Sequence, residues 1–97
     1  MKSLDEIERI LAEHKEELCR KYAIKAIGIF GSFVRGEQTE TSDLDVLVDF
    51  HELPDLLTFC EIERVLEEIL GVNVDLVEKS SIKRRIKDRI LSEAVTV

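Results

Sequence analysis

Two aspartates separated by one residue are the feature of this sequence best suited to chemistry. In SDLDVLVDF, residues 42–50, apolar residues alternate with Asp43 and Asp45, which is the pattern of a strand with one apolar face. Residues two apart in a strand point the same way, with Cα atoms about 7 Å apart, so both carboxylates can reach the same ions. Two like charges so placed repel each other, and a divalent cation removes the repulsion. Hard oxygen ligands favour Mg²⁺ or Mn²⁺.

A third carboxylate, Asp75, lies in the segment VNVDLV, residues 72–77. Its neighbours are apolar and β-branched, and an aspartate among them is unfavourable unless it is paired or binds a metal. With Asp43 and Asp45 it would form a cluster able to hold two metal ions about 3.5 to 4 Å apart, the spacing used in phosphoryl chemistry. Asp49 shares the strand face but lies about 13 Å from Asp45 along the strand, so we exclude it.

A glycine and a serine, Gly31 and Ser32, follow the apolar run AIKAIGIF. Glycine lets the chain turn tightly, and the amides that follow, with Ser32 starting a helical turn, form a concave anion site for phosphates. Arg35, one turn further, either contacts phosphate or pairs with an acid of the strand. Each feature alone also fits an ordinary turn, a solvated strand end or an ion pair. Their order and spacing together favour a metal and phosphate site.

The elements that would position these residues follow from hydrophobic periodicity and from helix-end signals. Ser3 and Glu6 form a capping box before the first helix, and Gly71 ends a later one. We expect helices over 4–21, 54–70 and 81–94, a short helix within 32–36, and strands over 23–30, 42–50 and 72–77. This order predicts one α/β domain with a mixed sheet of three main strands packed by helices. The pattern does not determine the strand order.

Composition sets the class of protein. The chain has 97 residues, of which 44% are hydrophobic and 36% charged, enough for one core but not for a second lobe. The apolar runs are shorter than the roughly 20 residues of a membrane span, and the charged N-terminus does not resemble a signal peptide. We therefore expect a cytoplasmic protein. Cys19 and Cys60 have no metal-ligand spacing and are expected to be reduced.

The charge is distributed unevenly. The formal net charge is −7, but residues 1–78 carry 19 acidic and 8 basic side chains, whereas residues 79–97 carry 2 acidic and 6 basic ones. The negative charge of residues 1–78 would repel nucleic acid, which is therefore disfavoured as a direct ligand. The basic last helix either packs on the core with a solvated basic face or steers an acidic partner surface or phosphates toward the protein. The sequence leaves both possibilities open.

The segment GSFVRGEQTETSDLDVLVDF, residues 31–50, resembles the G-S-x10-D-x-D signature of the DNA polymerase beta-like nucleotidyltransferase superfamily. The details GSF-RG and SDLDVLVDF, the aspartate of VNVDLV and the ending IKDRILSEAVTV are similar to the minimal nucleotidyltransferases (MNT). The resemblance spans nearly the whole chain, so we expect residues 1–97 to form one minimal nucleotidyltransferase domain. Val34 is a departure, since relatives often have alanine there, but it leaves the metal and phosphate positions intact.

The resemblance implies roles for individual residues. Gly31 and Ser32 match the nucleotide-phosphate turn, Asp43 and Asp45 the metal pair, and Asp75 the third carboxylate. It also implies an ATP substrate, two Mg²⁺ ions, and an antitoxin that joins a HEPN-type toxin in a hetero-oligomer and transfers AMP to a tyrosine of that toxin. Asp75 would then hold the metal on the nucleophile side and help to deprotonate the acceptor hydroxyl.

Two other functions are compatible with parts of the sequence. The chain could neutralise its partner by occlusion, with a nucleotide site that only binds; three clustered acids favour catalysis over this. Nucleotide addition to RNA is disfavoured, because the body is acidic and no RNA-binding lobe is present in these 97 residues.

Overall fold

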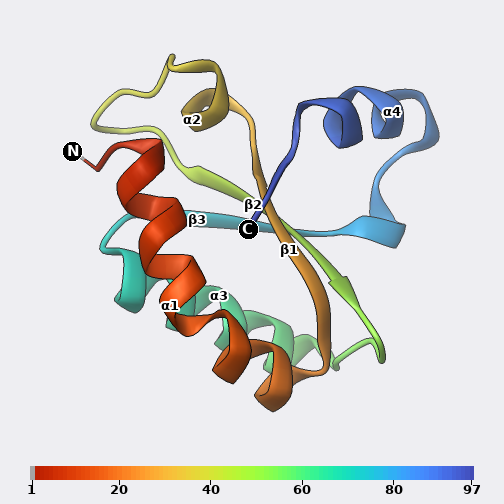
Figure 1. Ribbon diagram of the computed structural model, residues 1–97. Helices are drawn as coiled ribbons and strands as arrows, with labels where there is room; N and C mark the ends of the chain where they lie inside the picture. The colour runs from red at the N-terminus through yellow and green to blue at the C-terminus, as the bar shows by residue number, and fades with distance from the viewer. Residues whose placement is uncertain (1) are drawn as a thin grey trace.

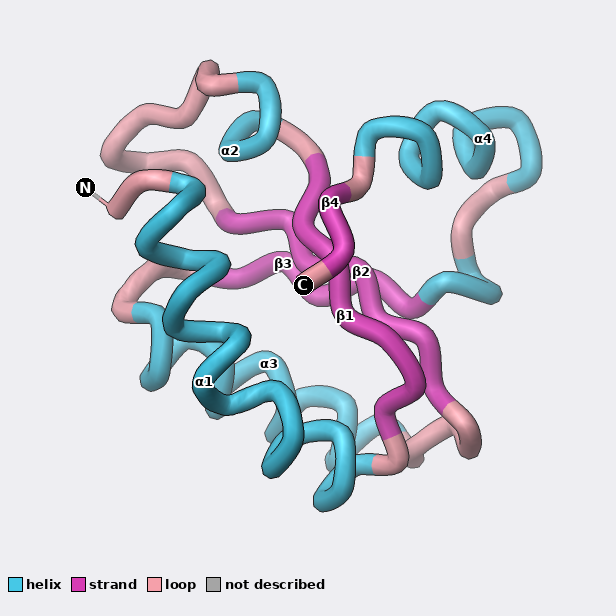
Figure 2. The backbone as a smooth tube through the Cα atoms, viewed as in Figure 1, coloured by secondary structure: helices cyan, strands magenta, loops and turns pink. Residues whose placement is uncertain are grey.

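The computed structural model describes residues 2–97 and contains four α-helices, one 3-10 turn and four strands. In chain order these elements are α1 (Leu4–Tyr22), β1 (Ile24–Phe30), α2 (Ser32–Arg35), β2 (Leu44–Phe50), α3 (Leu56–Leu70), β3 (Val74–Glu78), η1 (Lys79–Ser81), α4 (Arg84–Glu93) and β4 (Val95–Thr96). Figures 1 and 2 show α1 and α3 together on one side of the strands and α4 on another. The predicted α/β class is confirmed.

The sheet is mixed, with the strand order β3-β2-β1-β4. β1 is antiparallel to both β2 and β4, whereas β2 and β3 are parallel. The prediction of three main strands omitted β4, which pairs Ile29 with Val95. The amide of Val97 also donates to the carbonyl of Ile27 at 2.9 Å. A two-residue strand is too short to show alternation of its own, so the sequence predicts no element over residues 95–96.

One face of the sheet forms the core. The alternating residues Leu44, Val46 and Val48 of β2 have no exposed surface, as the strand pattern predicted. They pack under the apolar stripes of α1 and α3, whose buried residues include Ile7, Leu11, Ile62, Leu66 and Leu70. The predicted capping box is present, with the amide of Glu6 donating to Ser3 Oγ at 3.3 Å. This core leaves the opposite face of the sheet available for polar residues.

Two helix starts differ from the prediction. The N-cap of α3 is Asp55, which accepts from the amide of Thr58 at 2.7 Å, so Pro54 precedes the cap instead of lying in the first turn. The last helix begins at Arg84 instead of residue 81. The Glu78 carboxylate accepts from the amide of Ser80 at 3.0 Å and holds residues 79–81 in the separate turn η1. A side chain that binds the backbone two residues later competes with helix formation there.

α4 is held less firmly than the other long helices. None of its residues is fully buried, and Ile86 and Leu91 are 42% and 37% exposed. It lies across the sheet from α1 and α3 and is joined to the sheet through η1 and β4 (Figure 1). None of the helices within residues 2–97 has both the length and the apolar character needed to cross a membrane.

The packing of α3 predicts a contrast between two leucines. Leu66 is 1% exposed in the core, whereas Leu57 of the same helix is 82% exposed. We expect Leu66→Ala to lower the free energy of unfolding by about 2 to 4 kcal/mol, because a cavity forms, and Leu57→Ala to change it by less than about 0.5 kcal/mol. Urea denaturation of both variants measures the difference, and equal effects would contradict the described packing.

Candidate active site

The three predicted aspartates lie on the sheet face opposite the α1 and α3 core. Asp45 and Asp75 are register partners in the parallel strands β2 and β3, and neighbouring strands lie about 4.8 Å apart. Asp43 immediately precedes β2, two residues from Asp45. Asp45 is half-buried, whereas Asp43 and Asp75 are exposed. The structure therefore brings the three residues to one end of one face, as their pattern predicted.

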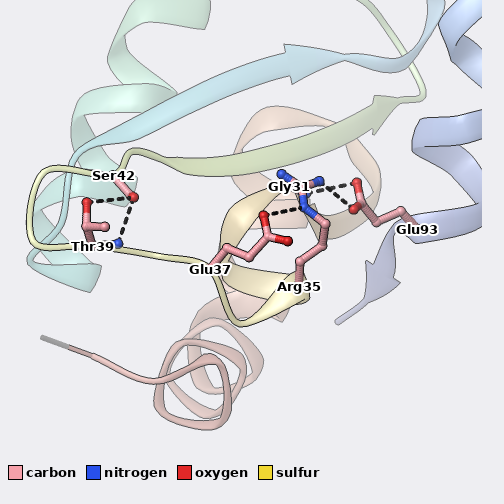
Figure 3. Close-up of polar contacts among 6 residues, drawn as sticks. All are labelled: Gly31, Arg35, Glu37, Thr39, Ser42 and Glu93. Carbon is pink, nitrogen blue, oxygen red and sulfur yellow. Dashed lines mark hydrogen bonds and ion pairs between the residues drawn. The ribbon is translucent and has the colours of Figure 1, made fainter.

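The loop before β2 is held by hydrogen bonds between its own residues and fixes the position of Asp43. The amide of Thr39 donates to Ser42 Oγ at 2.8 Å, and the amide of Ser42 donates back to the carbonyl of Thr39 at 3.1 Å (Figure 3). The next strand contact is the amide of Leu44, which donates to the carbonyl of Asn73 at 2.8 Å. Asp43 is thus held between a tight turn and the β2–β3 ladder.

The electrostatics of the site centre on Asp45. Burial raises the pKa of this carboxyl to about 6, and the negative charges of Asp75 and Asp43 act in the same direction. Arg35 acts in the opposite direction but does not offset these effects. A half-buried carboxylate with two acidic neighbours needs additional positive charge if it is to be ionised at neutral pH.

This donor set fits a hard divalent cation. Three carboxylates supply oxygen ligands only, and a cation among them would relieve the repulsion that acts on Asp45. Within residues 2–97, however, no three acidic, histidine or cysteine side chains converge closely enough to surround an ion as they stand. Asp49, excluded from the cluster, lies further along β2 with its Oδ2 3.9 Å from Lys79 Nζ.

Gly31 provides the space that Asp45 occupies. Its backbone has φ 81° and ψ −152°, a region almost restricted to glycine. A Cβ at this position would overlap the Asp45 carboxylate and lie 2.9 Å from its Cγ. Ser32 then begins α2, and the amides of Val34 and Arg35 donate to the Gly31 carbonyl at 3.1 and 3.2 Å. The Gly31-Ser32 turn and Asp45 are therefore in direct contact.

Arg35 is held between two glutamates from different elements (Figure 3). Its Nη1 lies 2.6 Å from Glu93 Oε1 at the end of α4, and its Nε lies 3.2 Å from Glu37 Oε2. The hydrogen bond from Arg35 holds the pKa of the Glu93 carboxyl below its usual range. The alternative that Arg35 pairs with an acid of the strand was wrong, because its partners come from α4 and from the loop after α2.

A cavity of about 270 Å³ opens between α4 and the turn after β1. Its lining residues are Phe30, Gly31, Arg35, Asp45, Ile86, Arg89, Ile90 and Glu93. A larger hollow of about 500 Å³ lies beside the Thr39–Ser42 loop and contains none of the three aspartates, so the smaller cavity is the better site candidate on chemical grounds. Glu93 was not predicted as a site residue from the sequence. The only available signal was its i+4 spacing from Arg89 in an amphipathic helix.

A family model for the nucleotidyltransferase domain matches residues 11–97. The chain belongs to the nucleotidyltransferase family. The resemblance found in the sequence is thereby confirmed, and the chain is a nucleotidyltransferase. The matched region includes all six predicted metal and phosphate residues, although their individual roles stay predictions.

Individual relatives cover nearly the whole nucleotidyltransferase. It is 54% identical over 97 residues to a protein adenylyltransferase MntA of Thermococcus cleftensis, covering 100% of this chain and 98% of the relative. A solved structure assigned as a minimal nucleotidyltransferase has a TM-score of 0.77 and 35% identity, covering 94% of this chain and 95% of that one. An MNT antitoxin in complex with a tri-AMPylated HEPN toxin of Shewanella oneidensis shares the fold, with a TM-score of 0.67, 20% identity and coverage of 93% and 70%.

The contact between Gly31 and Asp45 predicts that Gly31→Ala is costly. We expect a loss of about 3 kcal/mol in the free energy of unfolding, since a restricted backbone region and an overlap with the Asp45 carboxylate act together. Gly36→Ala is the matched control, because Gly36 also has positive φ, 71°, but a Cβ there meets nothing within 4 Å. Its cost should be about 1 kcal/mol. Equal losses in urea denaturation would exclude the proposed close approach.

The raised pKa of Asp45 predicts a stability that depends on pH. Because its pKa is about 6 in the folded protein and 3.8 ordinarily, ionised Asp45 opposes folding above pH 6, and this cost disappears near pH 4. In metal-free buffer at pH 8, Asp45→Asn should therefore stabilise the protein by about 1 kcal/mol after allowance for solvent screening. The gain should shrink toward pH 4. Asp49→Asn, on the same face beside Lys79, should give no such gain, and a less stable Asp45→Asn at pH 8 would refute the assignment.

Proposed function

We propose that this nucleotidyltransferase transfers AMP from ATP to a tyrosine of a HEPN-type toxin and acts as the antitoxin of that pair. One observation carries the proposal: Asp45 lies against the Gly31 turn on one side and beside Asp75 on the other, so the metal and phosphate positions adjoin. The 54% identity to a protein adenylyltransferase supports a protein acceptor. The shared fold with an MNT antitoxin bound to an AMPylated HEPN toxin supports the partner.

Different residues of the site would bind the metal ions and the phosphates. Asp43, Asp45 and Asp75 would hold two Mg²⁺ ions, which when bound neutralise charge on the phosphates and on the attacking oxygen. The amides of Gly31 and Ser32 would bind the β and γ phosphates, and Arg35 would add positive charge beside them. Because Asp45 is held between rigid strands, the chain contributes chiefly by positioning the reactants.

The transfer replaces one bond at the α-phosphorus of ATP with another. The tyrosine oxygen forms a bond to the α-phosphorus of ATP while the bond from that phosphorus to the oxygen bridging to the β-phosphate breaks. Pyrophosphate leaves with the electron pair of the broken bond. The tyrosine proton passes toward Asp75, which lies on β3 and is exposed, and from there to solvent. No covalent intermediate with the protein is needed.

The proposal extends to assembly and location. Residues 1–97 act as one minimal nucleotidyltransferase domain, and the toxin presents the acceptor tyrosine in a hetero-oligomer in the cytoplasm. Arg89 of α4 lines the cavity that contains Asp45, and the basic side chains of this helix would attract an acidic surface of the partner. The second candidate function is neutralisation by occlusion, in which the same nucleotide site binds without transfer.

Transfer and occlusion are separated by a labelling experiment. Purified chain is mixed with ATP labelled in the α-phosphate, Mg²⁺ and the protein encoded next to it, and label on the partner is measured by gel and by mass spectrometry. We expect label on a tyrosine, lost by at least about 100-fold in Asp43→Ala and Asp45→Ala, since each removes a metal carboxylate.

Asp49→Ala is the control for this experiment, because Asp49 lies on the same strand face but contacts Lys79. It should keep near wild-type labelling. A stable complex that forms without label, and is unchanged by Asp45→Ala, would instead establish occlusion.

A further inference from the structure

The Glu93 carboxylate occupies the position expected for a phosphate group. Its Oε2 accepts from the Gly31 amide at 3.2 Å, and its Oε1 lies 2.6 Å from Arg35 Nη1 (Figure 3). These two donors belong to the turn and the arginine that the proposed function assigns to the nucleotide phosphates. A carboxylate and a phosphate present similar anionic oxygens to such donors. One set of donors therefore has two possible acceptors.

Sheet register places Glu93 there. β4 pairs with β1 in the antiparallel sense, with Thr96 opposite Gly28 and Val95 opposite Ile29. Glu93 is the last residue of α4 and lies two residues before Val95, so this pairing brings the end of α4 beside the turn that follows β1. Strand pairing thus holds the end of α4 near Gly31, and the hydrogen bonds to the Gly31 amide and to Arg35 orient the Glu93 side chain there.

We propose that Glu93 is an internal competitor of the nucleotide, which occupies the phosphate site in the free protein and is displaced when a triphosphate binds. This inference rests on the proposed function, because it concerns the same site. Glu93 sets the affinity for phosphate groups without contacting the reacting atoms.

A competitor accounts for the local charges better than a structural clamp does. Glu93 adds negative charge beside Asp45, and its charge raises the pKa of that carboxyl further. Arg35 keeps a second partner, Glu37, at 3.2 Å, so the guanidinium stays in place when Glu93 leaves. The Glu93 side chain is 20% exposed and belongs to a helix with no fully buried residue, so it can turn toward solvent. Phosphate would then restore the ion pair with Arg35.

The test measures binding, without the partner and without turnover. Isothermal titration calorimetry gives Kd for a non-hydrolysable ATP analogue with Mg²⁺, for inorganic tripolyphosphate and for adenosine. The variants are Glu93→Gln, which is nearly isosteric, and Glu93→Ala, with circular dichroism to establish that both fold. We expect Glu93→Gln to bind the ATP analogue and tripolyphosphate about five to ten times more tightly, because a charge-assisted competitor is lost. Adenosine binding should not change.

Glu37→Gln is the matched control, since it removes the same charge from the same guanidinium but leaves the Gly31 amide bound to Glu93. Its affinity for tripolyphosphate should change by less than about twofold. If both Glu93 variants bind tripolyphosphate with the same affinity as the wild type or more weakly, Glu93 is a clamp for Arg35 and the inference is wrong. The proposed function then still stands. If neither the wild type nor any variant binds the ATP analogue with Mg²⁺, the proposed function falls with it.

Discussion

The repulsion among three carboxylates held at one end of a sheet is the constraint on which the rest of this structure depends. The parallel register of β2 and β3 sets Asp75 beside Asp45, and Asp43 precedes it by two residues. Their backbones are held in place, because Leu44 and Val46 of β2 and Val74 and Leu76 of β3 alternate with them and are buried in the core. The hydrophobic burial on one face therefore maintains the unfavourable charge on the other. Active sites commonly combine a stable scaffold with a locally unfavourable arrangement.

This arrangement makes the site dependent on positive charge from outside the chain. Arg35 lowers the pKa of Asp45, but its guanidinium is shared between Glu37 and Glu93. Two arginines, Arg35 and Arg89, and two carboxylates, Asp45 and Glu93, line the cavity, and Asp43 and Asp75 add negative charge beside Asp45. A site of this charge would bind a nucleotide triphosphate weakly by itself, since the ligand is also anionic. Divalent cations resolve both repulsions at once, which is why metal and nucleotide binding are expected to be coupled.

What could be predicted from the sequence depended on how local the signal was. The alternation around Asp43 and Asp45 lies within nine residues and was sufficient to assign the strand, its buried face and the direction of both carboxylates. The position of Asp75 beside them depends on the parallel pairing of β2 with β3, which no local pattern contains. The expectation rested on an aspartate among apolar, β-branched neighbours and was supported by the family resemblance. The start of α4 was predicted too early, because the Glu78 carboxylate holds a separate turn. Glu93 is 62 residues from Gly31, and its role becomes visible only with the register of β4.

The short strand β4 also explains how so small a domain could regulate access to its site. Core helices α1 and α3 carry the buried residues, whereas α4 has none and is tied to the sheet by two paired residues of β4. Local opening free energies are lowest where few apolar contacts hold an element. Displacing the end of α4 therefore leaves the core intact, and the aspartates stay on their strands. A contact carried by α4 can yield to a competing anion, whereas the same carboxylate on β1 or β2 could not.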